Sequence, residues 1–327
     1  MIARYIAQIL LTLAAAQIVP ADTIVFIETG SVSSASEQVA QALEIFKASV
    51  SRLPKAQEIQ PPRKVDPESL GVVVAASSAL VVDNRSNAEL FEKRSFEVRP
   101  IGSITKLMTT LVFLETNPAL DFMAAPQESD IREGGKQNLY LNNPVKLETV
   151  LQTSLIGSDN TAAMILVRAS GKSEQSFVAR MNELAQELGM SNTRFEDPTG
   201  LSAGNVSTAQ DIVLLLRKAL ANPIISQTTR TRDLLLTGPA GNQYKVRNTN
   251  ELLDSFINEP PNRILGGKTG YISEAGYCLA AEVQNATGDS VFVVVLGSTT
   301  NFDRFQDVKS LAAWSFLVFE WPQKSDS

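Results

Sequence analysis

The sequence predicts an α+β fold in which both ends of the chain build one β-sheet and a helical lobe is inserted between them. Short apolar, β-branched runs come first, amphipathic helices fill the middle, and two further apolar runs and a closing helix come last. Elements in that order are typical of a sheet assembled from distant segments of one chain. With 327 residues, 44% of them hydrophobic and 20% charged, the composition is that of an ordinary globular protein.

Residues 1–21 have the outline of a secretory signal peptide. Arg4 precedes a mostly apolar run, and Val19 and Ala21 are small residues at positions −3 and −1 of a possible cleavage site. The alternative is a buried or interfacial helix, because Gln8 interrupts the run and the run is too short to span a bilayer. The signal predicts an exported protein of the periplasm or cell envelope, and it leaves open membrane association through an uncleaved N-terminus.

The segment 22–68 is predicted to connect this signal to the folded part of the chain. Its residues 38–53 have the apolar spacing of an amphipathic helix. Residues 54–67 are rich in proline and charge, a composition typical of a linker. We therefore expect one folded domain over residues 69–322, beginning near Ser69, and a short tail over 323–327.

The first part of this domain is predicted to contain three short strands, because apolar and β-branched residues form short runs there. These runs cover residues 72–76, 80–83 and 89–93. Pro100 ends the extended structure, and the apolar spacing over residues 103–115 predicts a helix.

Four helices are predicted in the middle of the chain, where apolar residues repeat with the helical period. They cover residues 147–156, 161–169, 175–188 and 209–221. Gly189 is the expected C-cap of the third helix. The last third returns to strands at residues 276–283 and 290–296, before a final helix over about 303–319.

The composition excludes several classes of site. The chain contains no histidine, which removes Ser-His-Asp and Cys-His catalysis and most zinc sites. A nucleophile would therefore need a lysine or a carboxylate to activate it. Cys278 is the single cysteine, so no intrachain disulfide can form, and we expect it to be a small buried hydrophobe. The net charge of −6 gives no reason to expect a nucleic-acid partner.

Ser103 and Lys106 form the first of three candidate chemical motifs, S-x-x-K at the start of a predicted helix. Residues three apart lie on one helical face, so we expect the lysine amine beside the serine hydroxyl. A lysine that accepts a proton must be partly neutral, and burial near other cations lowers its pKa. Alone, the motif is more typical of a surface helix with a solvated lysine.

The second motif is Ser158-Asp159-Asn160, in a predicted turn between two helices. In such a turn the Ser158 hydroxyl can relay a proton to a leaving amine, and the Asn160 amide can bond a substrate carbonyl. The alternative is an ordinary helix-capping turn, which the same three residues also favour.

The third motif is Gly266-Gly-Lys-Thr-Gly270, which is predicted to enter a strand that continues through Tyr271 to Cys278. Glycines on both sides let the backbone approach a ligand closely. Lys268 and Thr269 together can hold a carboxylate, and a free strand edge can pair with a peptide. The alternative is a β-bulge with a surface lysine.

In this order, S-x-x-K, S-D-N and K-T-G are the signature of class A β-lactamases and penicillin-binding proteins. Over approximately residues 70–320, the sequence resembles the D-alanyl-D-alanine carboxypeptidase/endopeptidase family of low-molecular-mass penicillin-binding proteins. The segments that carry this resemblance are residues 103–108, 192–211, 248–252 and 268–279. The sequence looks closest to the endopeptidase branch, which has S-x-N followed by Ala-Ala and ends soon after the catalytic domain.

The resemblance implies a β-lactamase/DD-peptidase fold, with an antiparallel five-stranded sheet flanked by helices. It implies that Ser103 attacks the penultimate D-Ala of a peptidoglycan stem peptide and forms an acyl-enzyme, with Lys106 as base. Ser158 would relay the proton to the leaving group, and the backbone N–H groups of Ser103 and Tyr271 would form the oxyanion hole. β-Lactam antibiotics are then expected as acylating inhibitors, and neither a metal nor an organic cofactor is expected.

The same resemblance implies the substrate-binding residues. Asn160 would position the substrate, and the K-T-G motif of Lys268, Thr269 and Gly270 would bind it, with Lys268 and Thr269 holding its carboxylate or a mimic of it.

Two other functions share these residues. A serine β-lactamase would need a deacylating base, and Glu196 is a carboxylate at a suitable place. Its segment nevertheless ends in Pro-x-Gly-Leu, as in the peptidases, and lacks the Glu-x-x-Leu-Asn arrangement of a lactamase. A non-catalytic penicillin-sensing or wall-binding module would not need to retain all the motif residues. The sequence does not separate carboxypeptidase from endopeptidase, because both hydrolyse a bond C-terminal to D-Ala.

Overall fold

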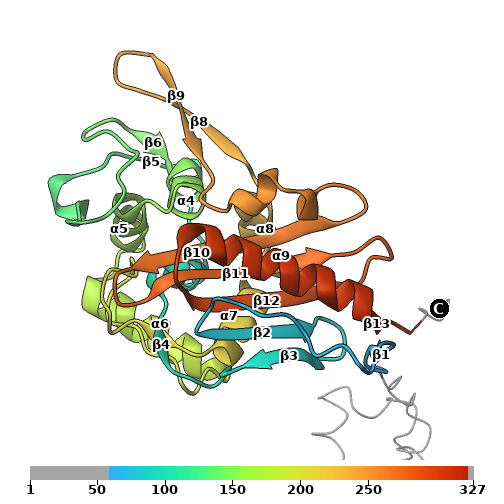
Figure 1. Cartoon of the computed structure of the whole chain (residues 1–327). Helices are drawn as coiled ribbons and strands as arrows, with labels where there is room; N and C mark the ends of the chain where they lie inside the picture. Colours follow the sequence, from blue (N-terminus) through green and yellow to red (C-terminus); the bar gives the residue numbers. More distant parts are fainter. Residues whose placement is uncertain (1–58, 323–327) are drawn as a thin grey trace, which may run out of the picture. The chain divides into compact units, whose positions relative to one another are not determined.

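A five-stranded antiparallel sheet forms the centre of the structure, a computed structural model that describes residues 59–322 (Figure 1). Its strands are β2 (Ser78–Asp83), β3 (Glu89–Lys93), β10 (Arg263–Ile272), β11 (Gly276–Gln284) and β12 (Ser290–Ser298). They are ordered β10-β11-β12-β2-β3, so the first and last parts of the domain lie side by side, as predicted. The predicted signal peptide, the predicted helix over 38–53 and the tail 323–327 lie outside the described residues.

Helices pack on both faces of this sheet (Figure 1). The α-helices are α3 (Thr105–Glu115), α4 (Leu147–Ile156), α5 (Asn160–Ala169), α6 (Glu174–Glu187), α7 (Ala209–Leu220), α8 (Pro223–Thr229) and α9 (Asn301–Val318). The 3-10 turns are η2 (Gly102–Ile104), η3 (Glu128–Asp130), η4 (Glu251–Asp254) and η5 (Phe256–Asn258). The inserted helical lobe and the long closing helix are confirmed.

Four small two-stranded ladders complete the described secondary structure. They pair β1 (Arg63–Lys64) with β13 (Phe319–Glu320), β4 (Arg99–Pro100) with β7 (Val206–Ser207), β5 (Met123–Ala124) with β6 (Val145–Lys146), and β8 (Asp233–Thr237) with β9 (Gln243–Arg247). Because β1 already pairs with β13, ordered structure begins ahead of the boundary predicted near Ser69.

Alternation along the central strand β12 divides the core into two layers. Phe292, Val294 and Leu296 join the cluster that contains α3 and the helical lobe. Val291 and Val293 point to the opposite face and pack with α9. Side chains on a strand alternate between faces, so a run of apolar residues is what a strand covered on both sides requires. The free thiol of Cys278 is buried in the first of these layers, as predicted, and burial raises its pKa to about 11.

The predicted helices form where the sequence places their caps. The Thr208 hydroxyl accepts a hydrogen bond from Asp211 N at 3.1 Å and caps α7. Thr300 and Asp303 form a reciprocal capping box at the start of α9. Gly189 follows the end of α6 and has φ of +78°, the left-handed conformation expected of a C-cap glycine.

Two predictions about strands are wrong. Residues 72–76 form no strand, because the backbone N–H groups of Ala75 and Ala76 donate to the Asp307 carboxylate of α9, each at 2.9 Å, instead of to a neighbouring strand. The strand of the third motif, β10, was predicted to continue to Cys278, but it ends at Ile272. Cys278 belongs to β11, which pairs antiparallel with β10 to form a hairpin.

No described helix combines the length and the apolar character that a membrane-spanning segment requires.

Candidate active site

The structure brings the three sequence motifs together beside strand β10. Ser103 lies in η2 and Lys106 in the first turn of α3, so the pair shares one helical face. Ser158 lies in the turn between α4 and α5, and Lys268 lies in β10. The two serines line a cavity of about 180 Å³, and the buried Lys106 and Lys268 lie behind its lining. Its lining includes the predicted residues Ser103, Ser158, Asn160, Thr269, Gly270 and Tyr271.

Lys106 is fully buried, and its amine faces three oxygen atoms. Nζ lies 2.9 Å from Ser103 Oγ and 2.5 Å from the Thr199 carbonyl oxygen, and it also contacts Asn160 Oδ1. Burial lowers the pKa of Lys106 to about 7, although nearby carboxylates, Asp197 first among them, act in the opposite direction. A substantial fraction of the amine is therefore neutral near pH 7 and able to accept a proton from the serine hydroxyl.

Lys268 forms a second buried pair of a lysine with a serine. Its Nζ donates to Ser158 Oγ at 2.9 Å and to the Thr269 carbonyl oxygen at 3.1 Å. Burial, together with the positive charges of Lys106 and Arg304, lowers the pKa of Lys268 well below its usual value. A positive charge on Lys106 therefore disfavours protonation of Lys268.

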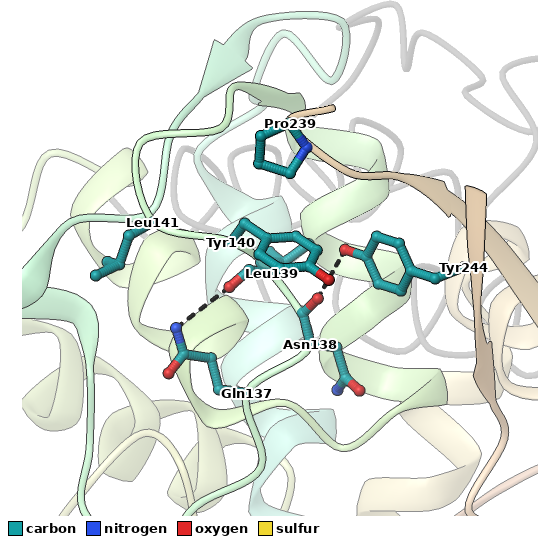
Figure 2. A pocket seen from close by; sticks show the side chains of 7 residues that line it. All are labelled: Gln137, Asn138, Leu139, Tyr140, Leu141, Pro239 and Tyr244. Atoms are coloured by element: carbon teal, nitrogen blue, oxygen red, sulfur yellow. Dashed lines mark hydrogen bonds between the residues drawn. The ribbon is translucent and has the colours of Figure 1, made fainter. Parts of the chain in front are cut away.

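The turn that carries Ser158 has an unusual backbone conformation. Ser158 has φ of +58°, in the left-handed region, which costs a residue other than glycine about 1–3 kcal/mol. Neighbouring hydrogen bonds hold it there. Asp159 accepts from Ala162 N at 2.7 Å and contacts Asn138, whose carbonyl oxygen in turn accepts from the Tyr244 hydroxyl at 2.7 Å (Figure 2). Strain held by its surroundings in this way is typical of functional sites.

Two glycines allow η2 to approach β10 closely. A Cβ atom on Gly102 would lie 2.6 Å from Tyr271 N, and one on Gly270 would lie 2.1 Å from the Ile101 carbonyl oxygen. Neither position can therefore carry a side chain without displacing backbone. The close approach places Ser103 and Tyr271, from segments far apart in the sequence, in the lining of one cavity.

The loop of residues 196–205 supplies the Thr199 carbonyl group that faces Lys106. Asp197 stiffens this loop, because its carboxylate accepts hydrogen bonds from three backbone N–H groups within it. The side-chain oxygen of the fully buried Asn205 accepts hydrogen bonds from two more backbone N–H groups, those of Glu196 and Asp197, and so closes the loop. The sequence offered no functional role for these polar groups, because their partners become visible only in the folded loop.

We expect Asn205→Ala to destabilise the protein by about 2–4 kcal/mol, because it leaves several buried polar groups unpaired. Besides its bonds within the loop, the Asn205 amide donates to the Thr105 hydroxyl of α3 at 3.0 Å. The measurement is urea unfolding, with Asn143→Ala as the control, since the Asn143 side chain donates to Thr237 O at 3.2 Å near the surface. Equal stability of the two variants would contradict this account of the loop.

Six residues that line the cavity were not predicted, and three of them have polar side chains, namely Lys136, Thr249 and Arg304. Thr249 Oγ1 lies 2.7 Å from Thr269 Oγ1, and Arg304, at the start of α9, donates to the Gly270 carbonyl oxygen at 3.1 Å. Thr249 belongs to a segment that carried the family resemblance. Lys136 and Arg304 look in the sequence like any surface cation, so nothing there could have singled them out.

The lining of the cavity suits an organic anion. Apart from Leu201 it consists of hydroxyl, amide, cationic and backbone groups, and it contains no Asp, Glu or Cys. Within residues 59–322, no group of three or more such side chains is arranged to hold a metal ion. Cationic and hydroxyl donors around one space favour a ligand that carries a carboxylate.

Comparison with known proteins gives the family. A family model described as D-alanyl-D-alanine carboxypeptidase matches residues 64–300. The chain belongs to this family. A D-alanyl-D-alanine endopeptidase of Escherichia coli is 34% identical over 247 residues, which are 74% of this chain and 77% of that protein. The family resemblance predicted from the three motifs is confirmed.

Solved structures agree with the D-alanyl-D-alanine carboxypeptidase family fold. The DD-transpeptidase of Streptomyces K15 matches with a TM-score of 0.70 and 26% identity, over 76% of this chain and all (100%) of that one. A penicillin-binding protein of Listeria monocytogenes, solved in its cefotaxime-bound form, matches with a TM-score of 0.64 and 29% identity, again over 76% and 100%. The predicted β-lactamase/DD-peptidase fold is confirmed.

Proposed function

We propose that this protein is a serine DD-peptidase that hydrolyses D-alanyl bonds of peptidoglycan, and that its preferred bond is the cross-link between stem peptides. The observation that carries the proposal is the buried contact of 2.9 Å between Ser103 Oγ and the amine of Lys106, whose pKa is about 7. Because the chain contains no histidine, Lys106 would be the base that activates the nucleophile Ser103. Membership of the family and the similarity to the endopeptidase of Escherichia coli support the choice of substrate and bond.

The proposed reaction begins when neutral Lys106 takes the proton of Ser103 Oγ, which attacks the carbonyl carbon of the D-Ala residue. The backbone N–H groups of Ser103 and Tyr271 would stabilise the oxyanion, where one donor is typically worth about 3–4 kcal/mol. The C–N bond then breaks, and Ser158 gives its hydroxyl proton to the leaving amine while it takes up the proton held by Lys106. Water finally hydrolyses the acyl-enzyme and regenerates Ser103.

Substrate would be held on both sides of this centre. Asn160, whose Oδ1 contacts Lys106, would hold a carbonyl of the acyl side through its amide N–H group. On the leaving side, Lys268 and Thr269 would bind the carboxylate, with Gly270 allowing the close approach of the peptide. Arg304 lines the same cavity and adds a further positive charge there.

A long-lived penicillin adduct is expected, which separates this proposal from a serine β-lactamase. Fast deacylation needs a base, yet the Glu196 carboxylate considered for this role is engaged by Ser202 Oγ at 2.8 Å and by Arg194 at 2.8 Å, and it does not line the cavity. The purified protein should therefore keep a fluorescent penicillin label for many minutes. Rapid turnover of the drug would contradict the proposal and favour the lactamase.

Digestion of purified peptidoglycan distinguishes the two possible bonds. We expect cross-linked muropeptide dimers to fall to monomers, since the leaving group is then the amine of a second stem peptide. Release of free D-Ala without loss of dimers would contradict the preference for the cross-link and make the protein a carboxypeptidase.

An exported protein at the periplasm or cell envelope fits this substrate, and we propose that location from the signal predicted over residues 1–21. Fractionation of cells that produce the tagged protein tests it, because a cytoplasmic pool alone would contradict export. Membrane association through an uncleaved N-terminus would leave the tag in the membrane fraction.

A further inference from the structure

A second, larger cavity opens beside the active-site cavity. Its volume is about 720 Å³, and three residues line both spaces, namely Lys136, Thr249 and Arg304. The other lining residues, from the end of β9, the segment after it and the start of α9, are Arg247, Asn248, Glu251, Asp254 and Asn301. We call this space the charged cavity. A ligand bound at Ser103 can extend into it without leaving the surface of the protein.

The border between the two cavities is cationic and incompletely paired. Arg304 is only 7% exposed, and its guanidinium donates to the Gly270 carbonyl oxygen and contacts Asn301 Oδ1, but its buried Nε has no hydrogen-bond partner among the described residues. The Lys136 ammonium likewise has no hydrogen bond or ion pair within residues 59–322. Two cations with donors to spare favour a carboxylate at this border.

The far wall of the charged cavity carries two carboxylates, Glu251 and Asp254, beside Arg247. Glu251 accepts from Asn301 Nδ2 at 3.1 Å, and Asp254 pairs with Arg247 at 2.5 Å. Carboxylate oxygens with remaining acceptor capacity suit N–H groups of a ligand. The charged cavity therefore offers positive charge close to Ser103 and hydrogen-bond acceptors farther away.

A third cavity, of about 610 Å³, has no charged side chain in its lining (Figure 2). Amide, aromatic and aliphatic residues line it, and none of them is charged: Gln137, Asn138, Leu139, Tyr140, Leu141, Pro239 and Tyr244. A charged peptide has no counterpart there, which leaves the charged cavity as the better match for one.

In the proposed reaction, the charged cavity lies on the side of the leaving group. If Lys268 and Thr269 hold the leaving residue's carboxylate, that carboxylate lies next to Thr249, because the two threonine hydroxyls are 2.7 Å apart. Thr249 lines both cavities, so the charged cavity adjoins this point and has room for whatever else the leaving residue carries. A leaving D-Ala carries only a methyl group and would leave that space unfilled.

We propose that the charged cavity binds the leaving strand of a cross-linked peptide, with a carboxylate-bearing diamino acid at the Lys136–Arg304 border and peptide N–H groups facing Glu251. A cross-link requires a diamino acid, because one amine forms the scissile amide and the other joins the second stem peptide. The inference rests on the proposed function and gives a structural reason for its preference between the two bonds.

The test compares two substrates with the same acyl side, a peptide ending in D-Ala-D-Ala and the corresponding cross-linked muropeptide dimer. The quantity measured is the ratio of kcat/KM for the dimer to that for the peptide. We expect Glu251→Ala to lower this ratio about tenfold, the effect of losing a hydrogen bond to a charged group, and Glu251→Arg to lower it further. The control is Glu148→Gln, an exposed glutamate at the start of α4 outside all three cavities, which should leave the ratio unchanged.

An unchanged ratio in both Glu251 variants would overturn the inference, while cleavage of dimers by the wild type would leave the proposed function standing. A wild-type protein that releases D-Ala but cleaves no dimer would also overturn it. If the wild type cleaves neither substrate and takes no penicillin label, the proposed function itself fails and the inference with it.

Discussion

Ser103→Ala is expected to abolish both penicillin labelling and hydrolysis of D-alanyl bonds, with a loss of at least about 10⁴-fold in kcat. Without Oγ there is no atom to form the acyl-enzyme, and water would have to attack the substrate directly. The fold should survive, because the hydroxyl contacts Lys106 alone among the described side chains and its removal opens little space. Binding of substrate should therefore persist in the variant.

Intact-protein mass spectrometry after incubation with a penicillin measures the acylation directly. The wild type should gain the mass of one drug molecule, and Ser103→Ala should gain none. Ser191→Ala is the control, since Ser191 is an exposed serine that follows α6 and takes no part in the cavity. If Ser103→Ala released D-Ala or split dimers as fast as the wild type, no serine peptidase built on this residue would be tenable.

The sequence predicted the arrangement of the motifs better than the network around them. S-x-x-K, S-D-N and K-T-G are local patterns, and each lies in the element predicted for it, because helix starts, capping turns and glycine-flanked strands depend on neighbouring residues. Their convergence could be predicted only through the family resemblance. The contacts of Lys106 with the Thr199 carbonyl group and of Thr249 with Thr269 join segments that no periodicity connects.

The errors in the predicted strands have the same origin. Residues 72–76 have the β-branched composition of a strand, but whether they pair depends on what faces their backbone, and that is the Asp307 carboxylate. The β8-β9 hairpin was missed because the middle of its first strand is three consecutive leucines, 234–236, without the alternation that marks a half-buried strand. Arg304 reaches the cavity because the fold brings the start of α9 against Gly270 of β10.

The rate of acylation by penicillin should rise with pH around a midpoint near 7 and then level off, because the neutral form of Lys106 is the base and burial sets its pKa at about 7. Lys106→Met, which keeps the length but removes the amine, should slow acylation about 10²–10⁴-fold and remove this midpoint. Asp197→Asn should move the midpoint to lower pH, because the Asp197 carboxylate raises the pKa of Lys106. Stopped-flow measurement of labelling between pH 5 and pH 9 gives all three results.

The stability of the protein gives an independent check on the same group. The pKa of Lys106 falls from 10.5 to about 7 on folding, so between these values the unfolded chain binds a proton that the folded protein does not. The contribution of Lys106 to the free energy of unfolding should therefore increase with pH from about 7 to 10.5, and Lys106→Met should remove that increase. A wild type whose acylation is flat between pH 6 and pH 8, with the same pH dependence of stability as Lys106→Met, would mean that Lys106 stays charged and that another group activates Ser103.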